Sequence, residues 1–304
     1  MRSYTYHWLD VFTSQPFGGN PLAVFPDAEG LSDAEMQNIA YELNLSETTF
    51  VLASQKPPAQ FRVRIFTPIN ELPLAGHPVV GTHFLLAHLG RYTLRPPETR
   101  VHQEIGAGIF PVDLICPQGR VERVRMTQAP PQFLARVPDL SALAEALGLS
   151  THDLLGEEAW PQVVSTGLPQ LIVPVRDLAA LKKIAPHLSA MRSICESVNS
   201  EMAYVFALEA FDKAARTHAR FVSGHYQFED PVTGSASGAM AAYLVHHGLI
   251  AGSGDAPVEW MHEQGHFLKR PGRVYITVHG KKGSVQNVQV AGEAVIMGKG
   301  EMFL

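Results

Sequence analysis

Hydrophobic and polar residues alternate in several short segments of the chain. The alternation is clearest in TTFVLAS (48–54), QFRVRIF (60–66), AYVFAL (203–208) and RVYITVHG (273–280). A period of two places successive side chains on opposite faces of a strand, so these segments predict β-strands.

Two other segments, 79–89 and 237–247, are apolar almost all the way round a helix. A helix that is apolar on every face must be buried, so each segment predicts a central helix wrapped by a curved sheet. Gly90 and Gly248 follow these segments and are expected to end the helices. The more polar stretch 139–160 predicts a helical connection.

The two apolar segments belong to an internal repeat. ELPLAGHPVVGTHFLLAHLG (71–90) aligns without a gap on EDPVTGSASGAMAAYLVHHG (229–248), and SETTFVL (46–52) resembles SEMAYVFAL (200–208). Each half has the same order of strand, strand, E-x-P-x-x-G turn and helix. A repeat of this length indicates duplication of one structural unit.

The fold class that follows is α+β, with two pseudo-symmetric lobes. Each lobe is expected to be a curved mixed β-sheet or barrel around one central helix. We expect the N-terminal lobe to span 1–118 together with a C-terminal strand at about 289–304. The C-terminal lobe is then 119–288.

Composition narrows the class of protein. The 304 residues are 46% hydrophobic and 17% charged, which is typical of a globular chain and excludes disordered and collagen-like classes. The net charge of -5 comes without a block of Lys and Arg, which argues against a nucleic-acid partner. No signal peptide or long apolar run is visible, so we expect a soluble cytoplasmic protein with no membrane partner.

Cysteine usage fits the same expectation. Cys116 and Cys195 are the only cysteines, too few for the disulfide framework of a secreted domain. Neither lies in a metal-binding or redox spacing, so both are predicted to be small core residues.

The turn before the first apolar helix is unusual because it reads Gly76-His77-Pro78. Glycine lets the backbone approach another group, and a proline at the first helical position wastes no hydrogen-bond donor. The free amides of such a helix start are suited to bind an anion. If the halves are related by a pseudo-twofold axis, Gly76-His77 and Gly234-Ser235 are expected to face each other across one small cleft.

Four stretches of the chain carry a family resemblance: DVFTSQPFGGNPLAVF (10–25), NLSETTFV (44–51), LAGHPVVGTHFLL (74–86) and EDPVTGSASGAMAAYL (229–244). Together they resemble the PhzF-like phenazine-biosynthesis isomerases, which have a diaminopimelate-epimerase-like fold. The resemblance implies two lobes with a site between them, no cofactor, and a homodimer.

The resemblance also implies roles for individual residues. Glu47 resembles the acid/base carboxylate, His77 its neighbour, and Asp230 and Ser235 a polar pair; the implied substrate-binding positions are Asn20, Gly76 and Gly234. A glutamate shielded from water can take and return a proton near neutral pH. Ser235 and the turn amides can hold a substrate carboxylate.

Structural explanations remain open for the same residues. Glu47 can be a strand-edge residue, and His77 can be a structural turn histidine. Asp230 before Pro231 is a good turn residue. Ser235 can be nothing more than a helix N-cap.

One departure separates the chain from the racemases of this fold, which use two thiols as opposed bases. The corresponding positions here are Ala75 and Thr233, and neither offers a thiolate. Racemisation by two cysteines is therefore excluded, whereas a single Glu47 suits the transfer of one proton within a conjugated acid.

Other motifs fail on spacing. His83 points away from His77 at about 100° per residue, and His88 lies roughly 16 Å further along the helix, so we predict no metal site. GAGIFP (106–111) lacks the third glycine and the helix of a dinucleotide fingerprint. Ser235, His77 and Asp230 lack the G-x-S-x-G elbow of a hydrolase.

The sequence therefore predicts a cofactor-independent isomerase. Glu47 would move a proton within a small, carboxylate-bearing, cyclic or conjugated substrate. The alternative is a non-catalytic protein of the same fold that binds a small ligand or a partner.

Overall fold

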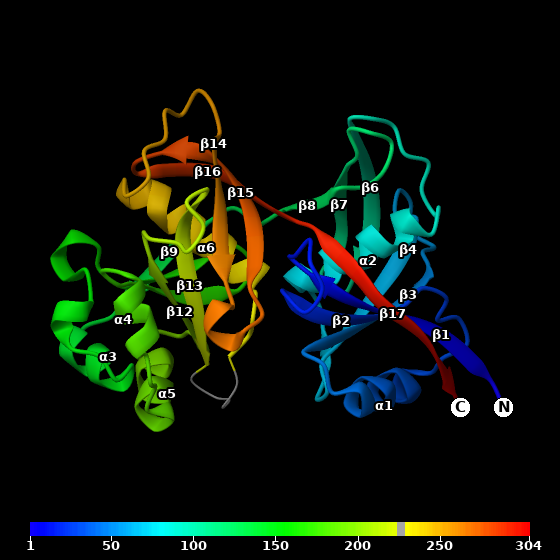
Figure 1. The fold of residues 1–304 in the computed structure, drawn as a ribbon, viewed down its shortest axis with the longest axis horizontal. Coiled ribbons are helices and arrows are strands. Elements are labelled where there is room, and N and C mark those ends of the chain that lie inside the picture. The colour runs from blue at the N-terminus through cyan, green and yellow to red at the C-terminus, as the bar shows by residue number, and fades with distance from the viewer. Residues whose placement is uncertain (224–228) are drawn as a thin grey trace. The chain divides into compact units, whose positions relative to one another are not determined.

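The computed structural model describes residues 1–223 and 229–304. The chain divides into two compact units, 1–126 with 291–304 (unit 1) and 127–290 (unit 2) (Figure 1). The boundary predicted from the sequence, after residue 118, falls a few residues before this division.

Unit 1 is a mixed sheet in the order β17-β1-β2-β3-β4-β6-β7-β8, with β5 paired on β4. Its elements are β1 (Ser3–Val11), β2 (Asn20–Phe25), α1 (Asp33–Leu43), β3 (Glu47–Ala53), β4 (Phe61–Phe66), β5 (Glu71–Leu72), α2 (Gly76–His88), β6 (Glu98–Ile105), β7 (Gly108–Ile115), β8 (Arg123–Thr127) and β17 (Ala294–Phe303).

Unit 2 contains a sheet in the order β9-β10-β11-β12-β13-β14-β15. Its elements are β9 (Gln132–Arg136), α3 (Leu140–Ala146), η1 (Thr151–Asp153), η2 (Gly156–Glu158), β10 (Gln162–Ser165), β11 (Pro169–Pro174), α4 (Leu178–Lys183), α5 (Leu188–Ser197), β12 (Met202–Ala207), β13 (Ala215–Ser223), α6 (Gly234–His247), β14 (Val258–Gln264), η3 (His266–Leu268), β15 (Gly272–Lys281) and β16 (Ser284–Gly292).

The strand pairings repeat between the two units. In unit 1, β2-β3 is parallel, β3-β4 antiparallel, β4-β6 parallel and β6-β7 antiparallel. In unit 2, β11-β12, β12-β13, β13-β14 and β14-β15 follow the same sequence of directions. In both units the long apolar helix lies between the third and fourth of these strands along the chain. The repeated topology is what duplication predicts.

Each long apolar helix is enclosed by the strands of its own unit (Figure 1). Apart from the half-buried Phe84, α2 is buried from His77 to Ala87, and it packs on β1, β2, β3, β7 and β17. α6 is buried from Ala236 to Val245 and packs on β10, β11 and β15. The prediction of two buried central helices is confirmed.

The helix ends follow the glycines. Gly90 and Gly248 have left-handed φ angles of 72° and 76°, as expected of residues that stop a helix. The starts lie earlier than the apolar pattern suggested, at Gly76 and Gly234. Pro78 is therefore the third helical residue rather than the first, still within the turn whose amides have no partner inside the helix.

α2 approaches the sheet closely at Gly81. A Cβ atom there would lie 2.6 Å from Leu22 Cδ2 and 2.7 Å from Val11 Cγ2.

We expect Gly81→Val to lower the free energy of unfolding by about 1–3 kcal/mol, because the extra carbons overpack the helix-sheet contact. Thermal unfolding followed by circular dichroism measures the effect. Gly298→Val is the control, since a Cβ at Gly298 meets nothing within 4 Å; an equal loss in both variants would contradict the packing argument.

Helices also cover outer faces of the sheets. α1 packs against Phe25, Phe50 and Phe66 of unit 1. In unit 2 the region 139–160, predicted to be helical, has one α-helix, α3, followed by the short turns η1 and η2. α3, α4 and α5 share a core cluster with β11 and β12 that includes the buried Cys195. Cys116 is also buried, so both cysteines are core residues as predicted.

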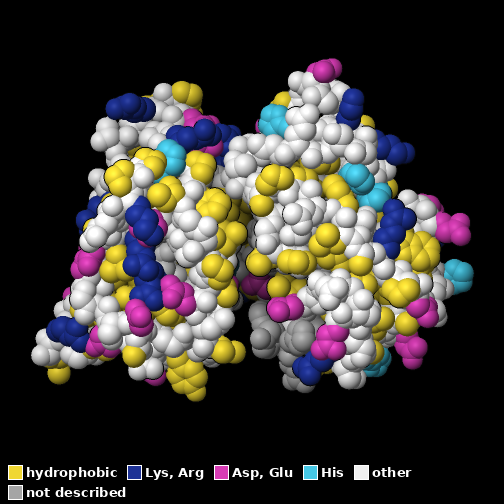
Figure 2. All heavy atoms as spheres, turned by 180° about the vertical axis from the view of Figure 1, so that it is seen from behind, with side chains coloured by type: hydrophobic (Ala, Val, Ile, Leu, Met, Phe, Trp, Pro, Cys, Tyr) yellow, Lys and Arg dark blue, Asp and Glu magenta, His cyan; other side chains and the backbone are white. Residues whose placement is uncertain are grey.

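The surface carries mixed charge. On the face drawn in Figure 2, Lys and Arg side chains lie among Asp and Glu side chains in each unit. Among the helices of the described residues, none has both the length and the apolar character that a membrane crossing requires.

Candidate active site

In unit 1 the strand register directs Glu47 toward the central helix. Glu47 is the first residue of β3 and pairs with Leu22 of β2, the residue that Gly81 of α2 approaches. Thr49, two residues on and therefore on the same face, contacts Thr82 of α2 through hydroxyl oxygens 2.8 Å apart. The Glu47 side chain thus lies on the face of the sheet that packs on α2.

Glu47 meets His77 at the start of that helix. Their Oε2 and Nε2 atoms are 3.3 Å apart, and the side chains are 17% and 6% exposed. Burial lowers the pKa of His77 to about 3, so its imidazole is neutral and the contact is not an ion pair. Within the described part of the chain, His77 Nε2 has no well-aligned hydrogen bond. Poorly aligned contacts of this kind are common in active sites without substrate, where they tighten on binding.

Asn20 and Gly76 belong to the same unit. Asn20 is fully buried, opens β2, and is two residues from Leu22, so it shares the face of the sheet that packs on α2. Gly76 opens α2 directly after Ala75, whose side chain cannot cap the helix. The first-turn amides of α2 therefore receive no cap from the residue that precedes them.

In unit 2 the turn before α6 gathers Asp230, Thr233, Gly234 and Ser235. The hydroxyl of Thr233 donates to Asp230 Oδ2 over 2.5 Å. Thr233 occupies the N-cap position, yet its side chain makes no capping hydrogen bond to the helix. Ser235 is the second residue of α6 and half-buried. The N-cap explanation for Ser235 is therefore wrong, whereas Asp230 does act within its turn.

An arginine on the preceding strand anchors the glutamate that begins each turn. Arg64 of β4 donates to both carboxylate oxygens of Glu71, over 2.8 and 2.6 Å. Arg220 of β13 forms the equivalent fork with Glu229, over 2.9 and 2.7 Å, and also donates to two carbonyl oxygens at the end of α4. We did not predict these pairs, although both glutamates stood in the repeat and both arginines in its alternating strands.

The predicted site residues thus fall into two groups. Glu47, His77, Asn20 and Gly76 lie in unit 1, and Asp230, Gly234 and Ser235 lie in unit 2. Within each group, the residues stand at the start of the central helix or on elements next to it. The expectation that both groups line one cleft stays a prediction.

A second histidine of α2, His83, has buried partners at both ring nitrogens. His83 contacts the Tyr92 hydroxyl at 2.7 Å and Gln103 Oε1 at 2.9 Å, both buried. This arrangement makes His83 a structural residue, in keeping with its exclusion as a metal ligand.

A separate cluster in unit 2 brings ligand atoms of His218, Glu263 and His266 within 4.8 Å of one another. His218 Nε2 lies 3.1 Å from His266 Nδ1, and the Glu263 carboxylate accepts the backbone amides of Phe211 and Asp212. Internal hydrogen bonds account for this cluster, so we assign no metal to it.

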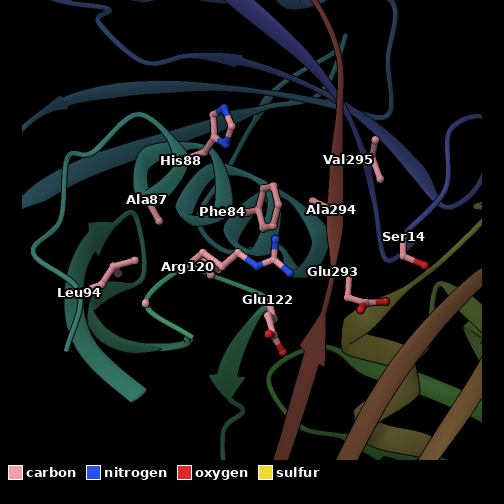
Figure 3. Close-up of a pocket in the computed structure, with 12 residues that line it drawn as sticks. Ser14, Phe84, Ala87, His88, Leu94, Arg120, Glu122, Glu293, Ala294 and Val295 are labelled. Atoms are coloured by element: carbon pink, nitrogen blue, oxygen red, sulfur yellow. The ribbon is translucent and has the colours of Figure 1, made fainter. Parts of the chain in front are cut away.

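A hollow of about 690 Å³ lies in unit 1 at the other end of α2. Its walls come from the last turn of α2, the loop before β8 and the start of β17. Figure 3 shows Phe84, Arg120 and the carboxylates of Glu122 and Glu293 among the side chains that line it. None of the predicted site residues contributes to it, and eleven residues of helix put His88 roughly 16 Å from His77. We therefore give this hollow no part in the chemistry around Glu47.

The chain is similar to known proteins over nearly its whole length. Residues 9–300 match the family described as "Phenazine biosynthesis-like protein". An uncharacterized isomerase of Clostridium acetobutylicum is 34% identical, with 100% of this chain and 99% of that protein aligned. The trans-2,3-dihydro-3-hydroxyanthranilate isomerase of Pseudomonas fluorescens is also 34% identical, over 99% and 100% of the two chains. The crystal structure of the PhzF-family protein of Bacillus anthracis is 31% identical and superposes with a TM-score of 0.89 over 100% of both chains.

The chain belongs to the phenazine biosynthesis-like (PhzC-PhzF) family and is an isomerase. The family resemblance and the fold class predicted from the sequence are both confirmed.

Proposed function

We propose that the chain is a cofactor-independent isomerase that moves a proton within a small carboxylate-bearing, cyclic or conjugated substrate. The observation that carries the proposal is the contact between Glu47 and a neutral, buried His77 at the uncapped start of α2. The relative from Pseudomonas fluorescens is named for its action on trans-2,3-dihydro-3-hydroxyanthranilate, a molecule of this chemical class.

The proposed chemistry balances without a redox partner. The Glu47 carboxylate takes a proton from one substrate carbon, and the electron pair of the broken C–H bond enters the conjugated system. Glu47, now a carboxylic acid, returns a proton to another carbon, which restores the enzyme. With its ring proton on Nε2, neutral His77 can donate to Glu47 in either state, because a protonated carboxyl group still has an oxygen that accepts.

The substrate carboxylate is assigned to the polar turns. Ser235 serves as its polar contact, and the amides of Gly76, His77, Gly234 and Ser235 serve as donors, because helix starts favour anions. Asp230, with His77, orients and tunes the reacting groups. Asn20 is assigned to substrate binding as well. A homodimer, a cytoplasmic location and the absence of a cofactor belong to the same proposal.

Gly76→Val tests the anion-binding role of the first turn. We expect at least a tenfold weaker affinity for the substrate, since a branched side chain would occupy the approach to the amides. The free energy of unfolding should change little, because Gly76 has no left-handed φ angle to lose. Isothermal titration measures the affinity, with Gly298→Val as the control. Unchanged binding by Gly76→Val would remove the turn from the substrate site.

The alternative is a protein that binds the same ligand without converting it. Incubating the purified wild-type chain with trans-2,3-dihydro-3-hydroxyanthranilate, followed by optical absorbance and NMR, separates the two functions. The proposal predicts a new isomer of unchanged mass. Tight binding with no conversion would support the alternative instead.

A further inference from the structure

A row of buried polar side chains lies behind the Asp230 turn in unit 2. Tyr204 of β12, Thr217 of β13, and His262 and Gln264 of β14 are each at most 1% exposed. Thr217 Oγ1 lies 2.8 Å from His262 Nδ1, His262 Nε2 lies 2.7 Å from Tyr204 Oη, and Tyr204 Oη lies 2.7 Å from Gln264 Oε1. Four polar side chains are thus joined in one line that leads to the turn. Ser237 of α6 also lies 3.0 Å from the Tyr204 hydroxyl, but it donates its own proton to the Thr233 carbonyl oxygen.

Backbone groups fix the orientation of Gln264. Its Nε2 donates to the carbonyl oxygen of Asp230 over 2.8 Å, and its Oε1 accepts the amide of Thr233 over 2.9 Å. A backbone amide can only donate and a carbonyl can only accept. A flipped Gln264 amide would place donor against donor and acceptor against acceptor, so only one orientation satisfies the turn.

The orientation of the Gln264 amide determines where Tyr204 and His262 carry their protons. Because Gln264 Oε1 only accepts, Tyr204 must donate its single hydroxyl proton to it. The Tyr204 oxygen must then accept from His262, so the His262 ring carries its proton on Nε2. His262 Nδ1 accepts in turn from the Thr217 hydroxyl. Burial lowers the pKa of His262 to about 3, even though a hydrogen bond with the Thr217 backbone raises it, so the ring is neutral.

The Gln264 amide also determines the direction of the Thr233 hydroxyl proton. Gln264 Nε2 donates to Thr233 Oγ1 over 3.2 Å, so the Thr233 hydroxyl proton is directed at Asp230 Oδ2. Asp230 Oδ2 is therefore the acceptor of that hydrogen bond. Because the Thr233 hydroxyl faces Asp230, it does not cap α6. The first amides of the helix are therefore not bonded to the Thr233 side chain.

We propose that this chain of donors, from Thr217 through His262, Tyr204, Gln264 and Thr233, positions the Asp230 carboxylate. Gln264 and Tyr204 are positioning residues that act through Thr233 and contact no substrate. They hold Asp230 in one orientation as a hydrogen-bond acceptor. The inference rests on the proposed function, in which Asp230 takes part in the reaction.

Tyr204→Phe and a matched control test the inference. Tyr92→Phe removes the same group from a similar setting in unit 1, since Tyr92 is 7% exposed and its hydroxyl also lies 2.7 Å from a histidine nitrogen. Both variants should lower Tm by a few degrees, because each leaves a buried polar group without a partner. Only Tyr204→Phe should lower kcat, on the order of tenfold or more, with KM nearly unchanged.

Gln264→Glu gives a second variant of nearly the same shape. Its added oxygen would face the Thr233 hydroxyl and draw that proton away from Asp230. We expect a similar loss in kcat, together with a change in the ¹³C chemical shift of the Asp230 carboxyl group. Thr233→Val should reproduce the loss, and Thr233→Ser, which keeps the hydroxyl, should restore at least half of the wild-type kcat.

The ring nitrogens of His262 provide a test without substrate. ¹⁵N NMR should show the proton on Nε2 in the wild-type protein. A proton on Nδ1, or a full kcat in Tyr204→Phe beside the same Tm loss as Tyr92→Phe, would overturn the inference. Measuring kcat of Glu47→Gln distinguishes failure of the proposed function from failure of this inference. Full activity of Glu47→Gln rejects the proposed function. An inactive wild-type protein also rejects the proposed function. The ¹⁵N NMR measurement of His262 would still test the direction of the hydrogen bonds in the donor chain.

Discussion

Glu47→Gln should reduce turnover by about a hundredfold or more while leaving substrate affinity within a few-fold of wild type. The amide keeps the shape of the side chain next to His77, 3.3 Å away in the wild-type protein, but it cannot accept a proton from carbon. A positioned general base contributes on the order of 10²–10⁴-fold to rate, which sets the size of the expected loss. Steady-state kinetics gives kcat, and isothermal titration gives the affinity.

Glu104→Gln is the matched control for this variant. Glu104 is a buried carboxylate of the same unit, 7% exposed, and it pairs with Lys56 and Ser54 rather than with any proposed site residue. We expect it to lose some stability and no more than about half of its turnover. An equal loss of turnover in both variants would mean that the effect comes from a damaged fold and not from a missing base.

Arg220→Met should lower the free energy of unfolding by about 3 kcal/mol. The change leaves the Glu229 carboxylate, 16% exposed, without its fork and removes the donor to the carbonyl oxygens of Leu181 and Ile184. Breaking a buried ion pair from one side is strongly destabilising because the remaining charge stays desolvated. Urea-induced unfolding of the full chain measures the loss.

Arg64→Met makes the corresponding change in unit 1, where it also removes an ion pair with the exposed Asp33. Glu71 is 38% exposed and can regain water, so we expect a loss of only about 1 kcal/mol. Equal losses at Arg64 and Arg220 would contradict the claim that burial of the glutamate sets the size of the effect. Arg220→Met should also lower kcat, because Glu229 directly precedes Asp230.

The repeat made much of the fold predictable. A helix that is apolar on every face must lie in a core, and most of 79–89 and of 237–247 is buried in α2 and α6, while the residues at the C-terminal ends are not. The helix starts were less predictable, because the first residues, Gly76 and Gly234, carry no hydrophobic signal. The stretch 139–160 was predicted as one helical connection, but tight turns interrupt it after Ala146.

The candidate site was predictable only in part. The contact between Glu47 and His77 follows from motifs that the resemblance identified. The Arg220-Glu229 fork and the role of Gln264 depend on strand register and on backbone groups of the turn, which single-sequence patterns do not encode. Strand register places Arg220 and Gln264 beside the turn at Glu229 and Asp230, although Gln264 is far from this turn in the sequence.

The central claim is that the Glu47 carboxylate carries a proton to and from a substrate carbon. The most direct measurement follows deuterium from heavy water into the carbon positions of trans-2,3-dihydro-3-hydroxyanthranilate and its product by NMR, at equal concentrations of wild-type and Glu47→Gln protein. The account predicts uptake at the newly protonated carbon with the wild-type protein and at least about a hundredfold slower uptake with Glu47→Gln. Equal uptake with both proteins would contradict the account and make Glu47 a structural residue.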